Sequence, residues 1–176
     1  MSAGGVPVTG ERHREDAADR VRAAVYAVRD PEIDVTLADL GVLRSLTVRD
    51  DAVDLVLAPT RTACPGRAAM EGAVRAAVAT VLPAAAVHVV WQPGAWRAEH
   101  VTERGLRTLR GCGYGVAGRG PACGEAATVQ LRRCPYCGSG VVESLGRFGG
   151  SVCRTPFLCR SCGSAFDELG SARDIK

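Results

Sequence analysis

The sequence predicts an α+β fold in which helices cover one face of a small sheet, followed by a small β-rich module. Segments with helix and strand periodicity succeed one another as helix, strand, strand, helix, strand. A stretch rich in Gly and Ala then lacks any period, and a cysteine-rich region follows it. We therefore expect a flexible tail, an α/β domain, a linker and the β-rich module, at residues 1–15, 16–112, 113–130 and 131–170.

The first three elements are a helix and a hairpin. Residues 16–29 carry apolar side chains at helical spacing, and Pro31 disfavours helical geometry just beyond them. Residues 42–49 and 53–59 are predicted as strands, joined so tightly at the Asp-Asp pair that they should form a hairpin.

The next elements are a helix, a strand and a short helix. Residues 66–82 have one apolar stripe, and Pro83 ends the pattern. Residues 86–91 alternate as a strand does, and residues 102–113 favour a further short helix. Together these elements make a sheet that needs helices on only one of its faces.

Composition limits the functional classes. The hydrophobic content of 47% is sufficient for a core, and the net charge of +3 gives no strong nucleic-acid signal. No apolar run is long enough to span a membrane, and residues 1–16 lack the apolar core of a secretory signal. We therefore expect a cytoplasmic protein whose eight cysteines stay reduced and serve metal binding or reactivity.

Four cysteines carry the strongest chemical signal. They form two C-x2-C pairs, each followed by a glycine, and they are Cys134, Cys137, Cys159 and Cys162. Four thiolates match tetrahedral Zn2+ and leave no position open, so the pattern predicts a structural zinc ribbon. An iron centre or cluster, and unligated redox cysteines, are the alternatives.

The other cysteines carry less information. Cys153 lies outside both pairs, and from the residues alone we interpret it as a small buried hydrophobe. Cys112 and Cys123 match no known spacing and receive no role. His88 alternates with strand valines and is interpreted as a surface or packed histidine.

Two loops could also carry chemistry. One holds Asp30 and Glu32 in "DPEIDVTLADLG", and acidic loop residues are usually solvated or capping. The other holds Cys64 in "PTRTACPG", ahead of a helix whose N-terminus favours a thiolate, with Arg61 and Arg67 nearby. On spacing alone, Cys64 could bind iron, attack an electrophile or be an inert buried residue.

A family resemblance adds to these interpretations. The motifs "DPEI…DLGVLRSL", "VDLVLAPTRTACPG", "WQPGAW" and "CPYCGS…GRFGGSVCRTPFLCRSCGSAFD" resemble the PaaD family in content and order. PaaD is the small subunit encoded with the multicomponent phenylacetyl-CoA epoxidase of phenylacetate degradation. The N-terminal part also resembles the wider iron–sulfur assembly domain family that includes SufT-type proteins.

The resemblance implies a role and a site. It implies the iron–sulfur assembly domain fold and an accessory or maturation subunit, rather than an oxygenase catalytic subunit. Its motif residues map onto Asp30, Glu32, Cys64 and Cys153, which would transiently hold iron or an iron–sulfur cluster. Its partners would be oxygenase or reductase client subunits, and a homodimer stays open.

Two further classes remain as alternatives. Zinc ribbons often bind nucleic acid, which would need exposed basic and aromatic side chains on the ribbon. A Cys64 thiol enzyme would need a base that the sequence does not place. The accessory role leads, with no catalytic residue assigned.

Overall fold

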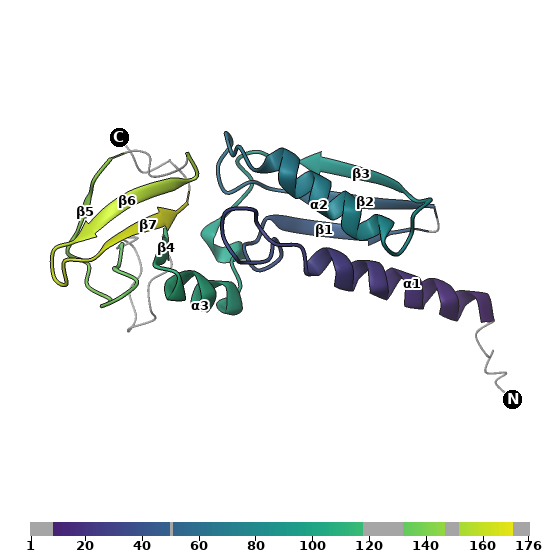
Figure 1. Ribbon diagram of the computed structural model, residues 1–176, viewed down its shortest axis with the longest axis horizontal. Helices are drawn as coiled ribbons and strands as arrows, with labels where there is room; N and C mark the ends of the chain where they lie inside the picture. Colours follow the sequence, from purple (N-terminus) through teal and green to yellow (C-terminus); the bar gives the residue numbers. More distant parts are fainter. Residues whose placement is uncertain (1–8, 50, 118–131, 147–151, 171–176) are drawn as a thin grey trace, which may run out of the picture.

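The computed structural model describes residues 9–49, 51–117, 132–146 and 152–170 (Figure 1). Its first sheet has the strand order β1-β2-β3, with bounds Leu43–Val48, Ala52–Leu57 and Ala86–Trp91. β1 and β2 form the expected antiparallel hairpin. β2 and β3 are parallel because the helix α2 (Arg67–Ala79) carries the chain back between them.

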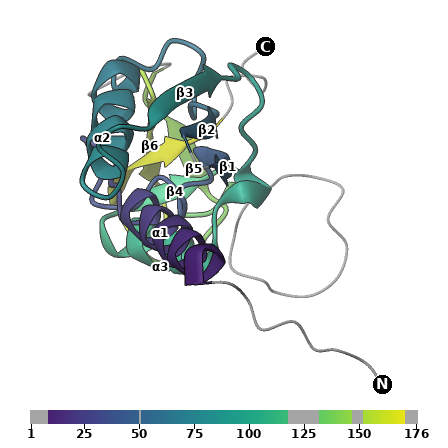
Figure 2. The same ribbon diagram turned by 90° about the vertical axis from the view of Figure 1, so that its right-hand side faces the viewer.

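Two helices cover one face of this sheet, as predicted. α1 (Thr9–Tyr26) buries Val21 and Val25, and α2 buries Met70, Val74 and Val78 at near four-residue spacing. The two helices contact each other, and both lie on the same side of the sheet (Figures 1 and 2). This apolar face is what the periodicity of the sequence encodes.

The segment before α1 differs from expectation. The helix begins at Thr9, so residues 9–15 belong to it rather than to a flexible tail. Polar residues dominate this first part of the helix, and an apolar period therefore could not reveal it.

Tight packing joins the loop after α1 to the segment after β3. Gly41 has φ +68°, and a Cβ there would lie 2.4 Å from the Cβ of His100 in the short 3-10 helix Ala98–His100. The indole Nε1 of Trp96 donates to the carbonyl of Leu40 over 2.7 Å, and Trp96 is buried. The "DLG" turn is therefore a packing element.

The helix α3 (Glu103–Gly111) follows and is capped by Thr102, whose hydroxyl accepts from the Gly105 N–H at 3.0 Å. Residues 114–116, which we expected in a linker, instead form the strand β4 (Tyr114–Val116). The other linker residues, and Cys123 among them, lie outside the described parts of the chain.

The second sheet is the ribbon. Its strand order is β4-β7-β6-β5, and the three ribbon strands are β5 (Val142–Ser144), β6 (Arg154–Cys159) and β7 (Ala165–Leu169). β4 pairs with β7 in parallel, whereas the ribbon strands pair antiparallel. The ribbon sheet is thus completed by a strand that comes from the preceding domain (Figure 1).

The junction between the two parts is apolar. Val116 of β4 and Leu169 of β7 belong to the same buried cluster as the core of the first domain. A second, smaller cluster surrounds the ribbon cysteines and contains the stacked rings of Phe157 and Phe166. Burial across the junction holds the two sheets in one arrangement.

Candidate metal centre and thiol pair

The ribbon brings together the four cysteines of the two C-x2-C pairs. Their sulfur atoms all lie within 4.8 Å of one another. The Cys134–Cys162 and Cys137–Cys159 sulfur distances are 3.7 and 3.6 Å. A regular tetrahedron with metal–sulfur bonds of about 2.3 Å has sulfur–sulfur edges of about 3.8 Å. The quartet therefore fits a tetrahedral metal ion.

The two pairs are built in the same way. Cys134 N–H donates to Ser139 O, and Cys159 N–H donates to Ser164 O, each over 2.9 Å. The glycine after each pair, Gly138 or Gly163, has φ +72° or +74°, the left-handed conformation that the sequence predicted for these turns. One cysteine of each pair is buried and the other is exposed.

A second sulfur pair lies where the two domains meet. Cys64 is half-buried in the loop before α2, and Cys153 is buried just before β6. Their thiol groups form a hydrogen bond with each other. A Cβ placed at Gly66 would lie 3.7 Å from the Cys64 sulfur and 3.3 Å from Pro31, so the acidic loop is adjacent.

This contact sets the acidity of both thiols. The Cys153 hydrogen bond is the largest cause that lowers the pKa of Cys64 to about 7, and the Gly66 backbone adds to it. Burial opposes the shift, as do the carboxylates of Asp30 and Glu32. The pKa of Cys153 is raised in turn, first by its hydrogen bond to Cys64 and then by burial.

The arginines expected to assist Cys64 act elsewhere. Arg61 hydrogen-bonds to the Thr155 hydroxyl, and the Arg67 guanidinium lies 4.9 Å from the ring centroid of Trp91. Neither is among the causes of the Cys64 shift. The helix N-terminus does contribute, through Gly66, but less than the unforeseen neighbour Cys153.

The acidic loop is divided in its roles. Asp30 accepts the N–H groups of Glu32 and Ile33 at 2.9 and 3.0 Å, and burial raises its pKa. Asp34 forms an exposed ion pair with Arg29. Only Glu32 extends toward the ribbon, where it forms a 3.2 Å ion pair with Arg154.

Arg154 is a site residue that the sequence did not indicate. Its guanidinium lies between Glu32 and the ring of Tyr114, 5.0 Å from that ring's centroid, and its side chain is only 16% exposed. Nothing in the sequence relates positions 32, 114 and 154 except that Arg154 follows Cys153. Only the folded chain brings them together.

Sulfur and carboxylate groups at this junction do not form a complete metal site. Across the ranges that the structure describes, the ribbon quartet is the one group in which three or more metal-binding side chains converge. The junction offers two thiols in contact and carboxylates beside them. Cys112, at the C-terminal end of α3, is exposed and takes no part.

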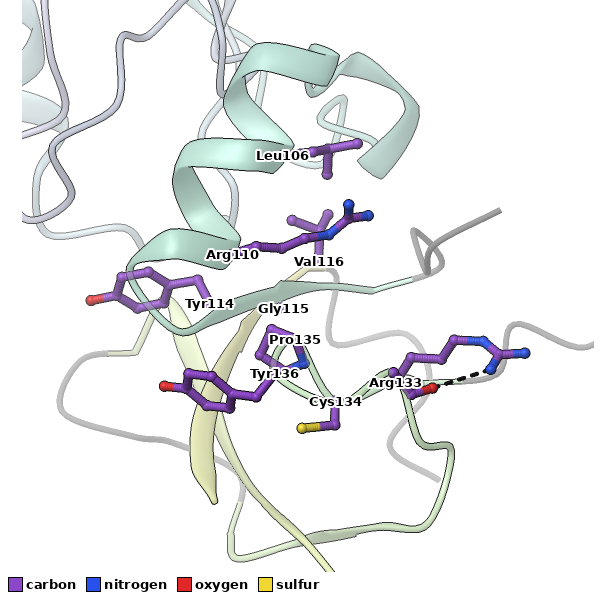
Figure 3. Close-up of a pocket in the computed structure, with 10 residues that line it drawn as sticks. Leu106, Arg110, Tyr114, Gly115, Val116, Arg133, Cys134, Pro135 and Tyr136 are labelled. Atoms are coloured by element: carbon purple, nitrogen blue, oxygen red, sulfur yellow. Dashed lines mark hydrogen bonds between the residues drawn. The ribbon is translucent and has the colours of Figure 1, made fainter. Parts of the chain in front are cut away.

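A pocket of about 200 Å³ opens between α3, β4 and the first cysteine pair (Figure 3). Arg110, Arg133, Tyr114 and Tyr136 line it, and Cys134 contributes to its wall. No acidic side chain is among its described lining residues. This cationic hollow adjoins the metal quartet on a different set of residues from the thiol pair.

The ribbon's aromatic side chains bear on the nucleic-acid alternative. Phe157 and Phe166 are buried against each other, so neither can stack on a base. Tyr136 is the exposed aromatic residue of the described ribbon. Within the described residues, none of the helices has the length and apolar character to cross a bilayer.

These features define a class of protein: a small α/β domain fused to a four-cysteine ribbon, with a thiol pair between them. Residues 18–90 match the family described as iron–sulfur cluster assembly protein, and residues 120–170 match the PaaD zinc beta ribbon domain.

A curated relative covers both parts. The chain is 32% identical over 152 residues to an Escherichia coli (strain K12) protein whose name makes it one of the subunits of 1,2-phenylacetyl-CoA epoxidase. The match covers 82% of this chain and 87% of the relative. The chain therefore belongs to the PaaD family.

Two solved structures are also similar to the chain. A domain of unknown function from Bacillus anthracis is 20% identical, with a TM-score of 0.49, over 56% of this chain and 96% of its own. A Mycobacterium tuberculosis protein associated with iron–sulfur complex assembly and repair is 24% identical, with a TM-score of 0.32, over 63% and 94%.

Proposed function

We propose that this protein is an accessory subunit of a multicomponent phenylacetyl-CoA-type oxygenase, acting in the cytoplasm. It would receive iron or an iron–sulfur cluster and pass it to a client, either a reductase that carries a cluster or an oxygenase that carries iron. The observation that supports this role most directly is the contact between Cys64 and Cys153 beside Glu32.

The chemistry of the pair suits transient holding. Thiolates are the preferred ligands of iron–sulfur clusters, and a Cys64 pKa of about 7 makes thiolate available at neutral pH. Two sulfurs leave coordination positions that ligands of the client can fill. A partly filled coordination shell allows the cargo to leave by ligand exchange, whereas a closed quartet would retain it.

The ribbon quartet has the opposite role. We propose that Cys134, Cys137, Cys159 and Cys162 hold Zn2+ permanently, because four ligands close the coordination shell. The described ribbon has a small apolar cluster, so the metal contributes much of its folding free energy. By ordering β6, the ion would also fix the position of Cys153.

The ribbon offers a surface for the client. β5 is at the edge of its sheet, and the exposed apolar side chains of Val141 and Leu145 flank it. Exposed apolar side chains beside an open strand edge favour protein contacts. A client docked there would meet the ribbon before it meets the thiol pair.

The test measures cargo transfer. Anaerobic, zinc-loaded protein is incubated with Fe2+ or a reconstituted cluster, and the bound iron is then transferred to an apo client subunit purified from the same oxygenase. Cys64→Ala should lose most of the labile iron and its transfer, while Cys112→Ala should behave as wild type. Equal transfer by Cys64→Ala and wild type would refute the carrier role.

Metal identity at the quartet needs a separate measurement. Elemental analysis should find one zinc per chain in wild type and in Cys64→Ala, and less in Cys134→Ala. If Cys64→Ala loses the zinc as well, the two sulfur sites do not have separate functions.

A further inference from the structure

Three consecutive residues of the ribbon contact three loop positions of the first domain. Cys153 contacts Cys64, Arg154 pairs with Glu32, and Thr155 accepts from Arg61. The two sulfurs are therefore held in register by polar contacts on the residues that follow Cys153. Their proximity is a property of the domain junction and not of one mobile side chain.

We propose that Cys64 and Cys153 form a reversible disulfide that joins the two domains, with small-molecule disulfides as the oxidising substrate. Both cysteines are free, and each thiol already hydrogen-bonds the other. Intracellular disulfides of this kind are generally transient, catalytic or redox-sensing. The described residues hold one other exposed thiol outside the quartet, Cys112.

Exposure sets the order of the two steps. Cys64 is half-buried, and its neighbours Ala63 and Pro65 are exposed, whereas Cys153 is buried at 7%. The Cys64 sulfur, as thiolate, attacks one sulfur of the small disulfide and displaces the other as a thiolate. The Cys153 sulfur then attacks Cys64 in the mixed disulfide and displaces the second small thiolate.

The exchange balances. Two protein thiols are oxidised by two electrons, one small disulfide is reduced to two thiols, and the two protons pass from the protein to the released thiolates. The consequence for regulation rests on the proposed cargo function. A disulfide uses both sulfurs, so the oxidised protein could not receive iron at this pair until a thiol reductant restored it.

The test uses the full, zinc-loaded chain and oxidised glutathione. Trypsin releases Cys64 in peptide 62–67 and Cys153 in peptide 148–154, so mass spectrometry can detect the two peptides joined. Wild type should lose two thiols per chain and yield this linked pair, while its zinc content stays constant. Cys112→Ser should yield the same pair.

Single variants identify the resolving thiol. Cys153→Ser should stop at a mixed disulfide, with one glutathione on peptide 62–67 that persists until a reductant is added. If wild type accumulates the same stable glutathione adduct as Cys153→Ser, or if Cys64 pairs with a quartet cysteine, the inference is wrong.

A second arm separates this inference from the proposed function. Reduced and oxidised proteins are each offered Fe2+ under anaerobic conditions. Iron uptake by the reduced protein without any linked peptide would overturn the disulfide alone. A linked peptide in a protein that takes no iron in either state would overturn the carrier role and leave the disulfide standing.

Discussion

Cys64 is the side chain on which most of the proposed chemistry depends. Its pKa of about 7 is set mainly by one neighbour, the Cys153 thiol, which hydrogen-bonds it from the other domain. A thiolate fraction at neutral pH therefore requires that the two domains stay together. Burial and two carboxylates oppose it, so loss of the Cys153 contact should have a large effect.

This dependence predicts a shift in reactivity. In wild type the alkylation rate of Cys64 by iodoacetamide should be half-maximal near pH 7. In Cys153→Ala the midpoint should move upward, toward or beyond the value of about 8.5 for an ordinary thiol. The label is quantified on peptide 62–67. An unchanged midpoint would show that Cys153 does not stabilise the thiolate.

Asp39 is the second residue with a defined energetic role. It is buried, and its carboxylate accepts from the Thr102 hydroxyl, from Arg104 at 2.8 Å and from the Thr36 hydroxyl at 3.0 Å. Burial alone would raise the pKa of Asp39, but these hydrogen bonds outweigh it and the pKa is lowered. The carboxylate thereby joins the "DLG" turn to the start of α3.

The lowered pKa gives a pH dependence with a definite sign. A depressed folded-state pKa adds stability above the unfolded value of 3.8, and that stability is lost as the pH falls through the folded value. Asp39→Asn should lower the free energy of unfolding by about 1–3 kcal/mol at pH 7. Urea titrations should show this difference constant above about pH 5 and shrinking below about pH 4.

At this scale the sequence predicted the ribbon ligands and missed the neighbours of Cys64. Local spacing is enough for C-x2-C pairs, because each pair is a short turn with its own glycine. The contacts of Cys64 with Cys153, and of Glu32 with Arg154, join positions far apart in the chain. No local pattern encodes them, and only the family resemblance indicated that Cys153 had a function.

Among the helices, α3 is held by the closest backbone contact. Gly105 faces the carbonyl of Asp39, and a Cβ added there would lie 2.5 Å from that oxygen. Backbone cannot move aside as a flexible side chain does. Gly72 in α2, by contrast, has nothing within 4 Å of the same position.

The two glycines therefore predict opposite effects of the same substitution. Gly105→Ala should destabilise the protein by about 1–3 kcal/mol, because α3 must shift away from the turn. Gly72→Ala should stabilise it by about 0.5–1 kcal/mol, because alanine loses less backbone entropy in a helix. Thermal unfolding of the two variants, measured side by side, checks the pair; the same sign for both would contradict this account.

Most elements were predictable because each has a local period. The stripe of α2 and the alternation of β3 follow from side-chain spacing, and β3 has the predicted bounds. β4 was not predictable, because three residues show no period. It is a strand only because β7 offers it an edge.

For the whole molecule, the main question is how the ribbon metal affects the distant thiol pair. β6 begins one residue after Cys153 and ends at Cys159, a member of the quartet. One short strand therefore connects the two sulfur sites. If the metal orders the ribbon, its loss should also disturb the environment of Cys64.

Zinc removal tests this connection. A chelator that removes zinc should expose Cys153 and raise the alkylation midpoint of Cys64, because the Cys153 hydrogen bond is lost. The readouts are maleimide labelling of peptide 148–154 and the pH profile of peptide 62–67. Added zinc should restore both. A zinc-free protein with an unchanged Cys64 profile would show that the sites are independent.

The strand β4 also limits how this protein can be divided for experiments. The ribbon family match begins at residue 120, after β4 has ended. A fragment cut at that boundary would leave the β7 backbone and the apolar Leu169 open to water and to other chains. Chimaeras that exchange ribbons between relatives should therefore carry their own Tyr114–Val116 segment, or they will aggregate.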